Sequence, residues 1–132
     1  MIESAEVGKI GEDIASNYLK NKGFSIVTRN YRKKYGEIDI IAYKVRKLHF
    51  IEVKTVTHID VRESDVPRET SSYRAEDNVH PWKLKRLSRT ISAYLGEKNL
   101  NGDEEWQFDV ITIQLNVKAK TARINFIKDI IL

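Results

Sequence analysis

The sequence predicts an α/β fold built from two helices and five strands in a single domain. Its 132 residues suit one domain with a substantial core. Two segments carry apolar residues at helical spacing, and five shorter segments are predicted as strands. The predicted order is one helix, three strands, a second helix and two final strands, with no internal repeat.

The first helix is predicted over residues 3–22. Its apolar residues recur at helical spacing, and they are Val7, Ile10, Ile14, Tyr18 and Leu19. Gly23 is placed to end this helix. Gly8 and Gly11 lie on a neighbouring stripe with Ala15. Because glycine costs a helix about 1 kcal/mol relative to alanine, the two glycines predict a close approach of the helix to a strand or a ligand.

Three strands are expected next, with a basic, aromatic turn at 31–35 after the first and a short turn near 44–46 after the second. Their predicted ranges are 24–30, 36–43 and 47–55. Residues 56–80 show little periodicity and are predicted as a long loop. A loop of this length is either a functional, flexible segment or a plain disordered insertion.

The second helix is predicted over 81–98, where Pro81 occupies the first position. Its apolar stripe consists of Leu84, Leu87, Ile91 and Leu95. Two strands near 105–115 and 122–131 complete the domain. Trp82 and Trp106 are expected in the core.

Composition sets broad limits on function. The charged fraction of 32% and hydrophobic fraction of 41% fit a soluble globular protein. The absence of cysteine excludes disulfides and thiolate metal sites. No secretory signal and no apolar run near the ~20 residues of a membrane span are found, so a cytoplasmic location is expected. The net charge of +4 is compatible with a nucleic-acid partner and equally with a bland basic surface.

Charges inside an apolar strand mark the candidate site. Glu52 and Lys54 alternate with Ile51 and Val53 directly after Phe50. A buried or half-buried charge is costly unless it is paired or binds a metal. Such a cost is tolerated most often at functional sites.

The hairpin register brings a second carboxylate to the same place. A turn centred between Val45 and Arg46 puts Asp39 directly opposite Glu52, with Cβ atoms about 4.5–5.5 Å apart. Lys54 joins them through the two-residue period of a strand. Two opposed carboxylates repel each other, and a divalent cation between them would reverse that effect. A one-residue slip would separate the two carboxylates onto opposite faces.

Two interpretations of these charges remain open from the residues alone. One is a solvated face carrying a surface salt bridge, which is the usual role of an isolated Glu-x-Lys. The other is a metal site, for which Glu12 in the first helix is a candidate further ligand.

Four motifs occur in order at suitable spacing. They are Gly11-Glu12-Asp13-Ile14-Ala15, Asn30-Tyr31-Arg32, Gly36-Glu37-Ile38-Asp39-Ile40-Ile41-Ala42 and Phe50-Ile51-Glu52-Val53-Lys54-Thr55. Together they resemble the motifs of the YraN-like proteins, which belong to the restriction-endonuclease-like superfamily of PD-(D/E)xK nucleases. The resemblance covers residues 8–55 and continues more weakly through the second helix to Phe108-Asp109-Val110-Ile111. The layout is also similar to that of the archaeal Holliday-junction resolvases.

This resemblance implies a restriction-endonuclease-like three-layer sandwich, in which helices flank a central mixed β-sheet. It also implies a metal-dependent nuclease centre using Mg²⁺, with Mn²⁺ as an alternative. By position, Asp39, Glu52 and the Val53 carbonyl would be metal ligands, and Glu12 a further ligand, either direct or through water. Lys54 would orient or help deprotonate the attacking water and stabilise charge on the phosphate.

The sequence departs from the pattern at two places. Many relatives carry arginine two residues after the lysine, where this chain has Val56, so a phosphate contact lacks its usual residue. The proline that names the superfamily motif is absent, and Ile38 precedes Asp39.

Basic residues predict where nucleic acid would bind, DNA being more expected than RNA. One cluster precedes the acidic motif and another lies on the second helix, and their members are Arg29, Arg32, Lys33, Lys34, Lys83, Lys85, Arg86 and Arg89. A solvated face is the alternative for each cluster. His49, His58 and His80 lack the spacing of a zinc site and are expected to be structural or exposed.

The leading expectation is a Mg²⁺-dependent endonuclease acting on DNA, including branched or structured forms. The alternatives are a binding module for DNA or RNA that hydrolyses little, and a protein-interaction domain whose charges are only surface features. A homodimer is expected by analogy with the junction-cutting enzymes alone.

Overall fold

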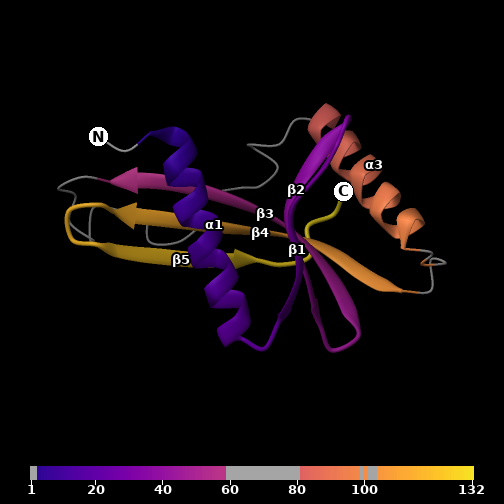
Figure 1. The fold of residues 1–132 in the computed structure, drawn as a ribbon, viewed down its shortest axis with the longest axis horizontal. Coiled ribbons are helices and arrows are strands. Elements are labelled where there is room, and N and C mark those ends of the chain that lie inside the picture. Colours follow the sequence, from indigo (N-terminus) through magenta and orange to yellow (C-terminus); the bar gives the residue numbers. More distant parts are fainter. Residues whose placement is uncertain (1–2, 59–80, 99, 101–103) are drawn as a thin grey trace.

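The helices and strands follow the predicted order. The structure, a computed structural model, describes residues 3–58, 81–98, 100 and 104–132. The elements are α1 (Ser4–Asn21), β1 (Ser25–Lys33), β2 (Gly36–Lys44), β3 (Lys47–His58), α3 (Pro81–Glu97), β4 (Glu105–Asn116) and β5 (Thr121–Ile127) (Figure 1).

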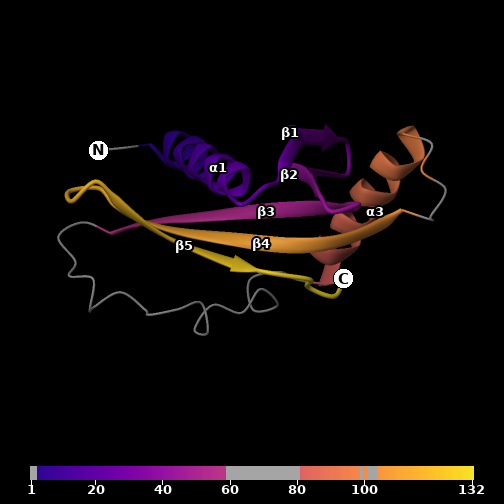
Figure 2. The same cartoon turned by 90° about the horizontal axis from the view of Figure 1, so that it is seen from below.

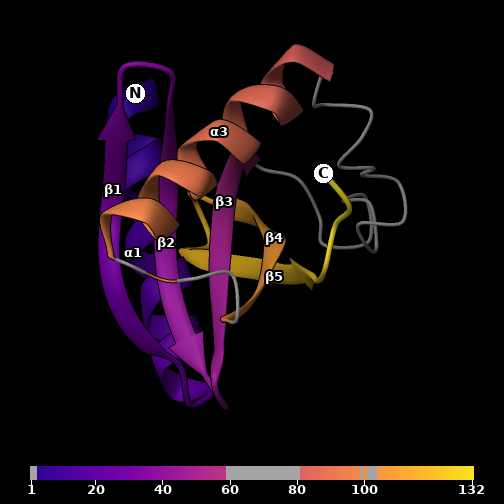
Figure 3. The ribbon, with the colours of Figure 1, turned by 90° about the vertical axis from the view of Figure 1, so that its right-hand side faces the viewer.

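One mixed sheet, with strand order β1-β2-β3-β4-β5, forms the middle layer. β3 and β4 run parallel, while the other neighbouring strands are antiparallel. Parallel neighbours need a crossover connection, and α3 lies in the chain between them. α1 crosses β3, β4 and β5 at a steep angle in Figure 1 and covers one face of the sheet in Figure 2, whereas α3 crosses the opposite face in Figure 3. The predicted three-layer α/β sandwich is confirmed.

The strands in the middle of the sheet are buried on both faces. Phe50 and Phe108 pack with Leu87 and Ile91 of α3. The next residue along β3, Ile51, packs instead with the cluster beneath α1. Burial on both faces explains why β3 is a nearly continuous apolar run in sequence, so the charge of Glu52 inside it is conspicuous.

The β2–β3 hairpin has the predicted register. Its ladder runs from Lys44 opposite Lys47 to Ile40 opposite Ile51, so the predicted pair of Asp39 and Glu52 lies beyond its end and is not formed as a ladder pair. The two turn residues, Val45 and Arg46, have φ values of 48° and 60°. Two successive positive φ angles are typical of the type I′ turn, which normally uses Asn and Gly. The turn is therefore set by the flanking strands rather than by favourable turn residues.

Strand lengths were predicted less accurately than strand positions. β1 continues to Lys33, which pairs with Gly36, so the predicted turn at 31–35 is reduced to Lys34 and Tyr35. β3 continues to His58 because it pairs with β4 throughout its length. The predicted loop therefore does not begin at residue 56, and its remaining residues, 59–80, lie outside the described residues together with His80.

The end of the chain and the two tryptophans also differ from prediction. β5 ends at Ile127 rather than near residue 131. Asp129, with a φ of 56°, interrupts the regular ladder, although the Ile130 amide still donates to the Phe108 carbonyl of β4. The Asp129 amide donates to the Asp109 carboxylate. Trp82 and Trp106 are 56% and 39% exposed, so neither is a core residue. Both lie near element ends, where a ring can rest on the surface.

Gly11 lets α1 approach β3 closely. A Cβ at this position would lie 1.8 Å from Thr55 Oγ1. None of the described residues lies within 4 Å of the corresponding position at Gly8. The predicted close approach of the helix to a strand is thus confirmed at Gly11, and Gly8 takes no part in it. The close approach of α1 to β3 holds the next residue, Glu12, near the middle of the sheet.

Replacing the two glycines separately tests this contact. We expect Gly11→Ala to destabilise the protein by about 1–3 kcal/mol through overpacking against Thr55. Gly8→Ala is the matched control and should stabilise it by up to about 1 kcal/mol through helix propensity. Urea unfolding followed by circular dichroism measures both, and equal stability of the two variants would contradict the close approach.

Candidate functional site

Asp39 lies where the regular pleat of β2 is interrupted. Ile38 belongs to the core beneath α3, whereas Ile40 belongs to the core beneath α1. Residues two apart on a regular strand share one face, so the alternation breaks at Asp39. On β1, both neighbours of Asn30, Arg29 and Tyr31, pair with β2, whereas Asn30 itself is not in the ladder and has a φ of 54°. The distortion frees the Asp39 side chain from the alternation of the sheet.

The Asp39 carboxylate accepts a backbone hydrogen bond from β3 just beyond the end of the β2–β3 ladder. The β2–β3 ladder stops at Ile40, and beyond it the Val53 amide donates a hydrogen bond of 2.8 Å to Asp39 Oδ2. A side-chain acceptor here satisfies a backbone donor that would otherwise lack a partner. The bond fixes Asp39 against the backbone between Glu52 and Lys54.

Other carboxylates surround Asp39. The pKa of Asp39 is raised to about 7, chiefly by burial and in smaller part by the negative charges of nearby carboxylates, while the Val53 hydrogen bond opposes the shift. These carboxylates are Glu12, Glu52 and Glu37. Only 19% of the Glu12 side chain and 17% of the Glu52 side chain are exposed. The fold thus brings the predicted ligands Asp39, Glu52 and Glu12 into one acidic cluster, from β2, β3 and α1.

Glu37 is a member of this cluster that the sequence analysis did not select. Its position two residues before Asp39 on the same strand was the available signal. With its amide nitrogen turned toward the cluster, Asn30 donates to Glu37 Oε1 at 3.2 Å and to Glu12 Oε1 at 3.1 Å. Asn30 therefore links the distorted segment of β1 to the carboxylates.

Two basic side chains offset part of this negative charge. Lys83 Nζ on α3 lies 3.2 Å from Glu52 Oε1. Arg29 Nη2 lies 2.9 Å from Asp13 Oδ1 and 3.6 Å from Glu12 Oε1. Both cations were predicted to contact nucleic acid, and here each pairs with a carboxylate instead.

Of the remaining residues predicted to contact nucleic acid, two pair with carboxylates and the rest do not among the described residues. Arg32 pairs with Glu37 at 3.1 Å, and Lys33 pairs with Glu97 at 2.8 Å. Arg86 Nε donates to the Tyr35 carbonyl, and its guanidinium lies over the Trp82 ring. Lys34 is exposed in the β1–β2 turn. Among the described residues, neither Arg86 nor Lys34 forms an ion pair with a carboxylate.

Lys54 lies beside the cluster without binding to it. The side chain is exposed, and within the described part of the chain it forms no hydrogen bond or ion pair. Its position two residues after Glu52 puts both on the same face of β3. The ammonium group is therefore available to an anion that approaches the carboxylates.

The donor set of the cluster suits a hard divalent cation. Asp39, Glu52, Glu12 and the Val53 carbonyl offer oxygen atoms alone, which is what Mg²⁺ prefers. The raised pKa of Asp39 shows that its charge lacks adequate compensation, which a cation would supply. Among the described residues, however, no three His, Cys, Asp or Glu side chains are already arranged as a metal-binding group. Glu52 in particular is directed to Lys83.

Comparison with known proteins identifies the family. The family model described as "Uncharacterised protein family UPF0102" matches residues 11–113. A UPF0102 protein from Alkaliphilus metalliredigens (strain QYMF) is 37% identical over 123 residues, which cover 92% of this chain and 96% of that protein. One from Dictyoglomus turgidum (strain DSM 6724 / Z-1310) is 34% identical over 119 residues, covering 90% of this chain and 91% of that protein.

The chain belongs to the UPF0102 family, which is the YraN family that its motifs resemble. The family model spans all four motifs, from Gly11 to beyond Thr55. Within the described residues, neither helix is both long and apolar enough to cross a membrane.

The raised pKa of Asp39 predicts a pH-dependent stability. The folded pKa of about 7 lies above the ordinary 3.8, so the folded protein binds more protons than the unfolded chain between these values. Stability should therefore fall as the pH rises through this window. The free energy of unfolding lost through ionisation of Asp39 reaches up to about 4 kcal/mol above pH 7.

Asp39→Asn removes this penalty while keeping an oxygen for the Val53 amide. In EDTA, we expect the variant to gain stability over the wild type at about pH 8 and to gain little at about pH 4. Urea unfolding at several pH values measures the difference. Glu6→Gln, an exposed change in the first turn of α1, is the control. A gain that does not depend on pH would contradict the proposed burial of charge.

Proposed function

We propose that this UPF0102 protein is a Mg²⁺-dependent endonuclease that hydrolyses phosphodiester bonds in DNA, including branched or structured DNA. The observation that carries the proposal is the Asp39 carboxylate, bonded to the Val53 amide in an acidic cluster with Glu52 and Glu12. The exposed Lys54 adjoins this cluster on β3. The motif resemblance to PD-(D/E)xK nucleases supports the same interpretation.

Each residue of the cluster has a proposed role. Asp39, Glu52, the Val53 carbonyl and Glu12 would hold the cation. When bound, Mg²⁺ would lower the pKa of a water molecule and polarise the phosphoryl group. Lys54 would place its compact positive charge beside the scissile phosphate and orient the attacking water. Asn30 and Arg29 would position Glu12 through the contacts described above.

DNA would approach over the basic side chains next to the cluster. Lys34 and Arg86 carry charges that no described carboxylate neutralises. Lys83 could join them once Glu52 serves as a ligand, since its ammonium would then be released from the ion pair. Contacts of this kind to phosphates would make binding strongly dependent on salt.

A binding module without hydrolysis is the second candidate function. It is favoured by the Lys83–Glu52 ion pair, which neutralises one of the proposed ligands without a metal. Val56, half-exposed where many relatives carry arginine, points in the same direction. Metal binding and cleavage distinguish the two functions.

Metal binding should appear as added stability. At a Mg²⁺ concentration about tenfold above its Kd, the wild type should gain about 1.4 kcal/mol, or several degrees in Tm. Glu52→Gln should lose most of this gain, whereas Lys54→Met should retain it. Thermal unfolding at about pH 8 with MgCl₂, compared with EDTA, measures the gain. An equal gain in wild type and Glu52→Gln would contradict Glu52 as a ligand.

Cleavage is tested on linear, flapped and four-way DNA with Mg²⁺, Mn²⁺ or EDTA. We expect metal-dependent cleavage that Glu52→Gln and Lys54→Met each reduce by about 10²-fold or more. The first would weaken binding of the cation, and the second would remove the positive charge beside the scissile phosphate. Glu6→Gln should cleave like the wild type. Salt-sensitive binding without cleavage would support the binding module, and undiminished cleavage by Lys54→Met would contradict the mechanism.

A further inference from the structure

A cavity of about 580 Å³ lies at the opposite end of the β2–β3 hairpin from the acidic cluster. The C-terminal end of α1, the hairpin turn, the start of β4 and the end of β5 enclose it. Of the lysines that line it, Lys44 is five residues from Asp39 along β2, and Lys47 is five residues from Glu52 along β3. Five residues span about 17 Å of a strand. The volume of the cavity is within the range of small-molecule sites, about 300–1,000 Å³.

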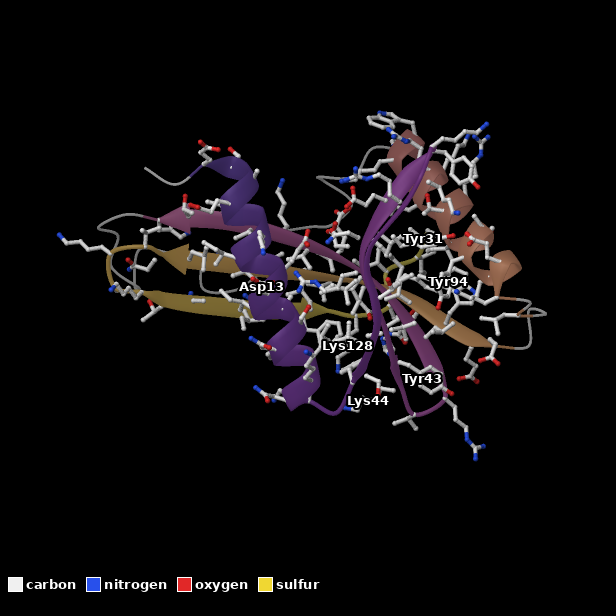
Figure 4. The ribbon with its side chains drawn as sticks, in the orientation of Figure 1. Asp13, Tyr31, Tyr43, Lys44, Tyr94 and Lys128 are labelled. Carbon is white, nitrogen blue, oxygen red and sulfur yellow. The ribbon has the colours of Figure 1, made fainter. Side chains whose placement is uncertain are left out.

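The cavity is strongly basic. Four lysines line it against one carboxylate, Glu105, and these lysines are Lys22, Lys44, Lys47 and Lys128. Within the described residues, none of the four forms an ion pair with a carboxylate. Figure 4 shows Lys44 and Lys128 close together beside the C-terminal half of α1. Lys44 Nζ donates to the Lys22 carbonyl at 2.6 Å and Lys47 Nζ to Gln107 Oε1 at 3.2 Å. These are neutral partners, so the positive charge around the hollow would attract an anion.

Aromatic rings lie beneath three of these lysines. The Phe126 ring contacts both others, with its centroid 5.9 Å from that of Phe24 at an interplanar angle of 52° and 6.3 Å from that of Tyr18 at 76°. Lys22 lies 5.6 Å from the Tyr18 centroid, Lys44 5.0 Å from Phe24, and Lys128 5.3 Å from Phe126. The cavity thus combines a wall of inclined aromatic rings with positive charge.

A buried dyad completes the lining. The fully buried Asp109 lies 2.7 Å from His49 Nδ1, and it also accepts hydrogen bonds from Gln107 Nε2 and the Asp129 amide. His49 lines the cavity and contacts Phe24 edge to face, with centroids 4.9 Å apart. Because Asp109 engages Nδ1, the ring orientation is fixed and Nε2 is the nitrogen left for a ligand. The proposed nuclease chemistry uses none of these residues.

We propose that this cavity binds a nucleotide, either free or at the end of a nucleic-acid strand. The four lysines would bind the phosphate, and the Tyr18 ring, which stands at 76° to the Phe126 ring, would be the platform on which the base stacks. His49 Nε2 would contact a polar group of the sugar or base. Aromatic stacking combined with lysine contacts to phosphate is the usual mode of sequence-tolerant nucleotide binding. A phosphate alone would leave the platform unused, and an uncharged aromatic compound would leave the lysines unneutralised.

Calorimetric titrations with AMP, adenosine and inorganic phosphate test the proposal in EDTA, where the metal site plays no part. We expect AMP to bind at least about tenfold more tightly than either fragment. Lys47→Gln with Lys128→Gln should weaken AMP binding by about tenfold or more. Lys9→Gln with Lys120→Gln removes the same charge from exposed positions outside the cavity and should leave AMP binding within about twofold. Circular dichroism verifies that all variants fold.

Tyr18→Leu separates stacking from charge. It should weaken AMP binding by about tenfold and leave phosphate binding unchanged, because it removes only the ring. A 5′-phosphorylated trinucleotide, compared with its 5′-hydroxyl form and with AMP, shows whether a strand end or a free nucleotide is preferred. The proposal is overturned if AMP binds no tighter than phosphate, if both lysine pairs have equal effects, or if neither AMP nor the trinucleotide binds. None of these outcomes affects the metal-binding and cleavage experiments, which test the proposed nuclease function separately.

Discussion

The hydrogen bond from the Val53 amide to the Asp39 carboxylate is the constraint on which the candidate site depends. It replaces a backbone contact where the β2–β3 ladder ends, so the strands can separate without leaving a buried donor unsatisfied. The same bond holds a carboxylate among other carboxylates, which burial alone would disfavour. The close approach of α1 at Gly11 then brings Glu12 to this point.

The two ends of the β2–β3 hairpin have opposite electrostatic character. Asp39 and Glu52 mark the acidic end, whereas Lys44 and Lys47 belong to the basic cavity. The overall charge of +4 does not reveal this separation. Composition was therefore a weak guide to function, and the separation of charge along the strands is the informative property.

The sequence predicted what depends on local pattern and missed what depends on distant contacts. Helical periodicity located both helices, and the hairpin register followed from the position of Val45 and Arg46. The extension of β3 to His58 depends on β4, about 60 residues away in the chain. The His49–Asp109 dyad likewise joins two strands that are neighbours only in the folded sheet. Both residues are visible in the sequence, His49 as a histidine and Asp109 as a charge in an apolar strand, but nothing in the sequence indicates that they pair.

The Lys83–Glu52 ion pair explains how the acidic cluster is compatible with folding before any cation binds. Without it, Glu52 would add an uncompensated, largely buried charge beside Asp39. Lys83 is itself 40% exposed, so its ammonium can return to water at small cost when Glu52 acquires another partner. Asp39 has no such counterion among the described residues, and its pKa rises instead. The cluster therefore accommodates its charge in two ways, by an exchangeable lysine at Glu52 and by protonation at Asp39, and a divalent cation would replace both.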